Sequence, residues 1–144
     1  MTAKFALSAA AGLTLFLASL PALAHHSFAA EFDAEKPVSM KGKFVKMDWV
    51  NPHSWIYMDV SGPAGKVVSW KCEALPPNGL YRGGWRKDSL KPGDEITVEG
   101  FLAKDGTSTM WTRTVTTADG RRMFAGNADS VPPTRTPSTD QPKQ

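Results

Sequence analysis

Hydrophobic and polar residues alternate through the middle of the chain, which predicts a protein built from β-strands. Over residues 38–49 the apolar positions first fall on Met40 and Phe44. They then move by one residue, to Val45, Met47 and Trp49. A period of two that slips by one residue is typical of a β-bulge. We therefore expect a long, bent first strand.

The same alternation predicts the strands that follow. In the strand expected over Ser54–Ser61, one face carries Ile56, Met58 and Val60. The other face carries Trp55, Tyr57 and Asp59, and His53, just before the strand, falls on the same parity. The Gly-Pro turn at 62–65 joins this strand to the next as a hairpin. The remaining expected strands are Lys66–Glu73, Glu95–Ala103, Ser108–Thr117 and a short one over Arg121–Phe124.

One short helical segment interrupts the strands. Prolines at 76–77 and glycines at 83–84 bracket it, as is typical of a helix of one or two turns. Three antiparallel strands, a short helix and two more strands match an all-β, OB-like Greek-key barrel of five to six strands, with the helix between strands three and four. A plain meander or a small sandwich has a similar strand count.

The two ends of the chain follow other patterns. Lys4 precedes a largely apolar run, and the small residues up to Ala24 form an A-x-A cleavage site. These features are typical of a secretory signal peptide. The alternative is a membrane anchor, although the run of about 16 residues is shorter than the roughly 20 that span a bilayer. We expect a signal peptide over 1–24, a barrel domain over 25–125, and a disordered, proline-rich tail without aromatic residues over 126–144.

Composition indicates the cellular compartment and limits the classes of possible partner. The formal charge of the chain is +3, and Lys4 is the only charged residue in 1–24, so the mature chain carries +2. This charge is too weak to indicate a nucleic-acid partner, and no basic amphipathic helix indicates membrane association after cleavage. Cys72 is the single cysteine, so no internal disulfide is possible. We expect a periplasmic or secreted protein.

The histidines suggest a metal site. Cleavage after Ala24 would make His25 the first residue, with its α-amine and imidazole on one residue. Two such nitrogens can chelate a metal ion, and a third imidazole would complete a set suited to copper. His53 is the distant candidate for that third nitrogen, and His26 could replace either. Equally, His25 and His26 can be an incidental mature start, and His53 a turn residue that bonds a backbone carbonyl.

Two residues at the end of the third strand bear on this site. Glu73 falls on the parity opposite to the core, where it could orient His53 as a carboxylate partner or remain a solvated charge. Cys72 is a weak candidate for a thiolate ligand. It shares the parity of Val68 and Trp70, which favours a buried apolar role.

The segment around Pro52 offers a second candidate surface. Asn51 and Pro52 favour a fixed corner between the first two strands. A ligand face of Trp49, Asn51, Trp55 and Tyr57 could then stack on a bound molecule, because the strand 2–3 face is the usual ligand surface of OB-type barrels. The alternative is that the tryptophans belong to the core. No catalytic signature occurs, so we expect no enzyme activity.

Several motifs together resemble a known family. They are His25-His26-Ser27-Phe28, Phe32-Asp33, Trp49-Val50-Asn51-Pro52-His53, Trp70-Lys71-Cys72-Glu73, Leu80-Tyr81-Arg82-Gly83-Gly84-Trp85 and Leu90-Lys91-Pro92-Gly93-Asp94. The chain from His25 to Phe124 is similar to the exported bacterial proteins catalogued as domain of unknown function 6152. The resemblance implies a secreted β-barrel domain and no mechanism.

Two functional hypotheses follow. The first is a periplasmic binding protein that holds copper, another transition metal or a small ligand between the mature N-terminus and the Asn51-Pro52-His53 corner. The second is a metal-free interaction module whose aromatic face binds a peptide, a glycan or an envelope protein.

Overall fold

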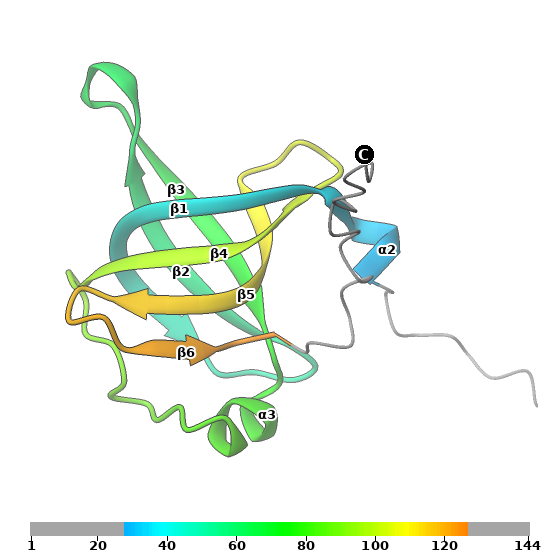
Figure 1. Cartoon of the computed structure of the whole chain (residues 1–144), viewed down its shortest axis with the longest axis vertical. Helices are drawn as coiled ribbons and strands as arrows, with labels where there is room; N and C mark the ends of the chain where they lie inside the picture. Colours follow the sequence, from blue (N-terminus) through cyan, green and yellow to red (C-terminus); the bar gives the residue numbers. More distant parts are fainter. Residues whose placement is uncertain (1–27, 127–144) are drawn as a thin grey trace, which may run out of the picture.

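Six β-strands and two short helices make up the computed structural model, which describes residues 28–126 (Figure 1). The strands are β1 (Phe32–Asp48), β2 (Ser54–Ser61), β3 (Val67–Ala74), β4 (Glu95–Ala103), β5 (Thr109–Thr117) and β6 (Arg122–Phe124). The helices are α2 (Phe28–Glu31) and α3 (Pro77–Arg82), and a 3-10 turn, η1 (Pro63–Gly65), joins β2 to β3. Neither helix approaches the length or hydrophobicity of a membrane-spanning helix.

The strands close into a barrel. Their order is β3-β2-β1-β4-β5-β6, and β3 also pairs with β5, which closes a barrel of five strands and leaves β6 as an extra strand on β5. The β3–β5 pairing is parallel, whereas the other pairings are antiparallel. With α3 between β3 and β4, this arrangement confirms the OB-like Greek-key barrel predicted from the sequence.

The first strand is longer than predicted and serves two neighbours. It begins at Phe32, and it pairs with β4 up to Lys43 and with β2 from Lys43 onward. The predicted bulge is confirmed between Phe44 and Lys46. Met47 and Trp49 pack against the core, but Val45, which the sequence placed on the same parity, does not: it is the extra residue of the bulge and is 42% exposed.

The main core fills the barrel. Ile56 and Met58 from β2 are fully buried, as the alternation along this strand predicted. At one end, Leu80 of α3 and Trp85 are also fully buried, so the helical segment covers the bottom of the barrel. Trp85 Nε1 donates a 2.8 Å hydrogen bond to the carbonyl oxygen of Phe124, which ties this cover to β6.

A second, smaller apolar cluster is separate from this core. It consists of the buried residues Phe32, Phe101 and Trp111, with Phe28 and Ala103 packed against them. Phe28 lies edge-on to Phe101 and Trp111, with ring centroids 5.5 and 5.3 Å apart. This cluster attaches α2 to β4 and β5. The helix depends on this attachment, because four residues form too few internal hydrogen bonds to be stable alone.

Candidate functional site

The site is centred on a contact between a histidine and a carboxylate. Nδ1 of His53 lies 2.5 Å from Oε1 of Glu73. The Glu73 side chain is 8% exposed, whereas that of His53 is 36% exposed. In this geometry Nδ1–H donates to the carboxylate, so the lone pair of a neutral imidazole is on Nε2. One edge of the ring is therefore fixed, and the other is able to bind a metal ion or accept a proton.

Strand register explains this contact. In the β2–β3 hairpin, Trp55 pairs with Glu73 and Ser54 with Ala74. His53 immediately precedes β2, at the end of a corner that contains a cis Asn51–Pro52 peptide. The corner and the hairpin thus bring together two of the residues singled out in the sequence, His53 and Glu73.

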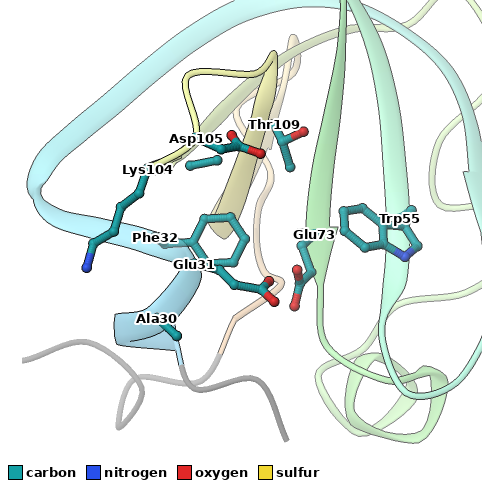
Figure 2. A pocket seen from close by; sticks show the side chains of 9 residues that line it. Ala30, Glu31, Phe32, Trp55, Glu73, Lys104, Asp105 and Thr109 are labelled. Atoms are coloured by element: carbon teal, nitrogen blue, oxygen red, sulfur yellow. The ribbon is translucent and has the colours of Figure 1, made fainter.

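A cavity of about 610 Å³ lies beside Glu73 (Figure 2). Its walls come from α2 with the start of β1, from β2 and β3, and from the β4–β5 hairpin. In Figure 2 the carboxylates of Glu31 and Glu73 point into the cavity from opposite walls. The lining residues are Ala30, Glu31, Phe32, Trp55, Glu73, Ala103, Lys104, Asp105 and Thr109. The volume is in the range of sites for small molecules.

Helix α2 forms one edge of this cavity because the β4–β5 hairpin holds it there. The backbone N–H of Lys104 donates a 2.9 Å hydrogen bond to the carbonyl oxygen of Glu31. Nζ of Lys104 donates a second, 2.6 Å bond to the carbonyl oxygen of Ala29. These bonds satisfy carbonyl groups at the end of α2 that have no partner within the helix. The position of the chain at Phe28 is therefore fixed next to the cavity.

The outer face of β2 carries two aromatic rings, each with a lysine over it. Nζ of Lys71 lies 3.9 Å from the centre of the Trp55 ring, and Nζ of Lys46 lies 4.5 Å from that of Tyr57. Lys46 also bonds both carboxylate oxygens of Asp48 at 3.0 Å, which lowers the pKa of Asp48. Partial burial and the adjacent Asp48 raise the pKa of Tyr57. Cations thus already occupy positions from which a ligand could stack on these rings.

Three other predicted site residues have surroundings that differ from those of His53 and Glu73. Trp49 packs against the main core and stacks on Tyr81 of α3, with centroids 5.1 Å apart, so it does not share the outer face of Trp55. Asn51 is exposed at the corner. Cys72 is fully buried on the core side of β3, and burial raises the pKa of its thiol to about 12. The structure places Cys72 with the core, away from Glu73, because neighbouring residues of a strand face opposite sides.

The remaining predicted ligands, His25 and His26, lie outside the described residues, as do the expected signal peptide and all but the first residue of the expected tail. Within residues 28–126, no three histidine, cysteine, aspartate or glutamate side chains are grouped so as to hold a metal ion. His53 and Glu73 are thus two members of a site that would need a ligand from elsewhere.

Sequence reasoning missed most of the cavity. Glu31, Phe32, Lys104 and Asp105 line it, but they come from segments about 70 residues apart and share no motif. Strand parity was the one available signal, and it identified Glu73 and Trp55, which both line the cavity. No comparable signal marked α2, whose four residues are too few to show helical periodicity.

The chain was also compared with known proteins. No curated protein matches this sequence. A family model does match it over residues 13–112, which is more than half of the chain and extends from before the described residues into β5. This match agrees with the motifs at the corner, in α3 and at the end of β3. The chain therefore belongs to the family of unknown function DUF6152.

Proposed function

We propose that the domain is an exported, periplasmic binding protein that holds a transition-metal ion, copper first, between its mature N-terminus and His53. The observation that carries this proposal is the 2.5 Å contact from His53 Nδ1 to the buried Glu73 carboxylate. A carboxylate that fixes one nitrogen of an imidazole and leaves the other exposed is the usual environment of a metal-binding histidine.

The fixed position of α2 supports the involvement of His25. Phe28 packs on Trp111, Trp111 pairs with Glu73 across the β3–β5 ladder, and Glu73 contacts His53. Paired strands are about 4.8 Å apart. His25 is three residues before Phe28, and three residues span at most about 10 Å. These contacts place Phe28 beside the strands that carry Glu73, which supports an N-terminal ligand as the missing member of the site.

The proposed donor set has a defined chemistry. His25 would supply its α-amine and Nδ1, and His53 would supply Nε2. Glu73 would orient His53 through the contact with Nδ1. Nitrogen ligands of this kind favour copper among the divalent first-row metals. Bound copper would supply a Lewis-acidic and redox-active centre.

Copper titration of the processed protein tests the proposal. The chain is exported, and its intact mass is measured to show whether residues 1–24 have been removed. Cu²⁺ binding is then followed by calorimetry and by electron paramagnetic resonance, which reports nitrogen ligands. The His25→Ala variant keeps the α-amine but removes the imidazole of the proposed chelate. We expect this variant and His53→Ala each to weaken the affinity for Cu²⁺ about tenfold or more.

Glu95→Gln is the matched control, because Glu95 forms an exposed ion pair with Lys41 and is not a proposed ligand. It should bind Cu²⁺ as the unmodified chain does. If the processed protein does not bind Cu²⁺ above background, or if His25→Ala and His53→Ala both bind it unchanged, the proposal is wrong.

A second candidate function is metal-free binding of a peptide, a glycan or an envelope protein by the outer face of β2. The two half-buried rings, Trp55 and Tyr57, favour it. We rank it second because Lys71 and Lys46 already lie over these rings. Glycan and peptide arrays probed with the processed protein would test it. Binding that is lost in Trp55→Ala and kept in His53→Ala would support this function over metal binding.

A further inference from the structure

A second β-bulge directs one arginine onto the outer surface of the barrel. In the β4–β5 ladder, Glu99 pairs with Thr114 and Gly100 with Thr112, so Arg113 is the extra residue. A bulge of this kind changes the direction of a side chain, and bulges are frequent beside binding sites. The backbone of Arg113 is held firmly, because its carbonyl oxygen accepts hydrogen bonds from the N–H groups of Ala125 and Gly126, at 3.0 and 3.3 Å.

The bulge also depends on a glycine. A Cβ atom at Gly100 would be 1.8 Å from the carbonyl oxygen of Trp111, so only glycine fits opposite the extra residue. The backbones of both strands thus fix the direction of the Arg113 side chain.

Arg113 lines a surface pocket of about 420 Å³ on the face formed by β1, β4, β5 and β6, which are adjacent in that order (Figure 1). Arg122 of β6 lines the same pocket from another strand. Pro37, Val38 and Phe101 provide its apolar part. The pocket is separate from the cavity at Glu73, since the two share no lining residue.

The charges in this pocket are unbalanced. Oε2 of Glu99 accepts a 2.8 Å hydrogen bond from Nη2 of Arg122 and a 2.6 Å bond from the hydroxyl of Thr114. Arg113 has no hydrogen bond or ion pair from its guanidinium to any residue in the part of the chain that the structure describes. With two arginines and one glutamate, the pocket carries one net positive charge.

We infer that this pocket binds a small organic monocarboxylate, with the carboxylate on the guanidinium of Arg113 and the apolar body against Pro37 and Val38. A guanidinium offers two parallel N–H groups that match the two oxygens of a carboxylate. The single net charge of the pocket matches a carboxylate better than a doubly charged phosphate. This inference is independent of the metal site proposed above.

Benzoate is a suitable probe, because it joins one carboxylate to an apolar ring. It is titrated into the processed protein while amide chemical shifts are followed by NMR. We expect a dissociation constant in the millimolar range, about that of a single ion pair with some apolar contact. The shifts should be centred on Ser39, Gly100 and Arg113. Benzylamine, which has the same ring and the opposite charge, should cause no shifts there.

Three matched variants locate the binding. Arg113→Gln should weaken benzoate binding about tenfold or more, and Arg122→Gln should weaken it less, because Arg122 is already paired with Glu99. Arg121→Gln is the control, since Arg121 donates to the carbonyl oxygen of Ser89 and does not line the pocket. Thermal melting of each variant checks that the fold is kept.

Several results would overturn the inference. Benzoate could cause no shifts at the pocket, or Arg113→Gln could bind benzoate as tightly as Arg121→Gln does. Equal binding of benzylamine and benzoate would show an apolar surface without charge selection. If inorganic phosphate binds at the pocket more tightly than benzoate does, the pocket holds an adventitious ion only, and the inference is wrong.

Discussion

Lys104 donates a 2.6 Å hydrogen bond from Nζ to the carbonyl oxygen of Ala29, and so joins the β4–β5 hairpin to the first helix of the described chain. Together with the bond from the Lys104 amide to Glu31, it holds a helix of one turn that would not form in isolation. The position of this helix decides where the preceding residues can lie. The proposed metal site therefore depends on contacts made by residues that would not touch the metal.

Phe28→Ala should release α2 while the barrel stays folded. Phe28 contacts Phe32, Phe101 and Trp111 in the cluster outside the barrel, and each aromatic pair contributes about 0.5–1.5 kcal/mol. The amide of Lys104 reports this region, because it is bonded to Glu31. Native-state hydrogen exchange of this amide should become about tenfold faster.

Phe124→Ala is the control for this measurement, since Phe124 is 61% exposed and does not belong to the cluster. Exchange at Lys104 should be unchanged in this variant. If Phe28→Ala also leaves that exchange unchanged, the aromatic cluster does not hold α2. A weaker affinity for Cu²⁺ in Phe28→Ala alone would link the cluster to the proposed metal site.

Glu73→Gln should weaken the proposed metal site without removing any metal ligand. Glutamine keeps the size of the side chain but loses the charge that orients the imidazole of His53 and increases its basicity. Loss of such a partner commonly lowers metal affinity about 10–100-fold. Calorimetric titration with Cu²⁺ measures the change, and Glu95→Gln, which alters an exposed ion pair with Lys41, is the control.

Nitrogen chemical shifts of His53 provide a readout that needs no metal. In the unmodified protein they should show a proton on Nδ1, as the contact with Glu73 requires. A neutral His53 with its proton on Nε2 would contradict the proposed role of Glu73.

Alternation along the chain was sufficient to predict most of the barrel. The expected bounds of β2 and β4 agree with the structure, because each has one face in the core and one outside. The start of β1 was missed. Asp33, Glu35 and Lys36 show no alternation, and this part of the strand packs through Phe32 on a cluster outside the barrel. Patterns along one strand do not reveal contacts of this kind.

The candidate site was only partly predictable for a similar reason. The pairing of Trp55 with Glu73 follows from the hairpin register, so parity could bring Glu73 near His53. The partner of Trp49 could not be found in this way, since Tyr81 lies on a helix whose orientation is set by tertiary packing. Arg113 was missed because a bulge breaks the parity on which such reasoning depends.

Gly42→Ala should destabilise the barrel more than most single substitutions do. A Cβ atom at Gly42 would be 2.5 Å from the carbonyl oxygen of Asp59, where β1 leaves β2 to continue along β4. We expect a loss of about 2–4 kcal/mol in the free energy of unfolding, measured by urea denaturation. Gly79→Ala in α3 is the control and should remain within about 1 kcal/mol of the unmodified protein. Equal stabilities of the two variants would contradict the close approach at Gly42.

Cys72 should make the protein less stable as the pH rises above about 9. Burial raises the pKa of the thiol from its ordinary value of 9.0 to about 12 in the folded state. Below pH 9 the thiol is protonated in both states, so stability does not change with pH on its account. Between pH 9 and 12 the unfolded chain loses this proton and the folded chain keeps it. Stability should therefore fall by up to about 1.4 kcal/mol per pH unit.

Urea denaturation between pH 8 and 10.5 measures this slope, and Cys72→Ala removes the thiol while every other titrating group remains. The slope of stability against pH should be smaller in the variant than in the unmodified protein. At pH 8, a thiol reagent should react with Cys72 in urea-unfolded protein and only at the rate of unfolding in native protein, because the fully buried sulfur must first be exposed. Rapid labelling of the native protein, or identical slopes in the two chains, would show that Cys72 is not held in the core as described.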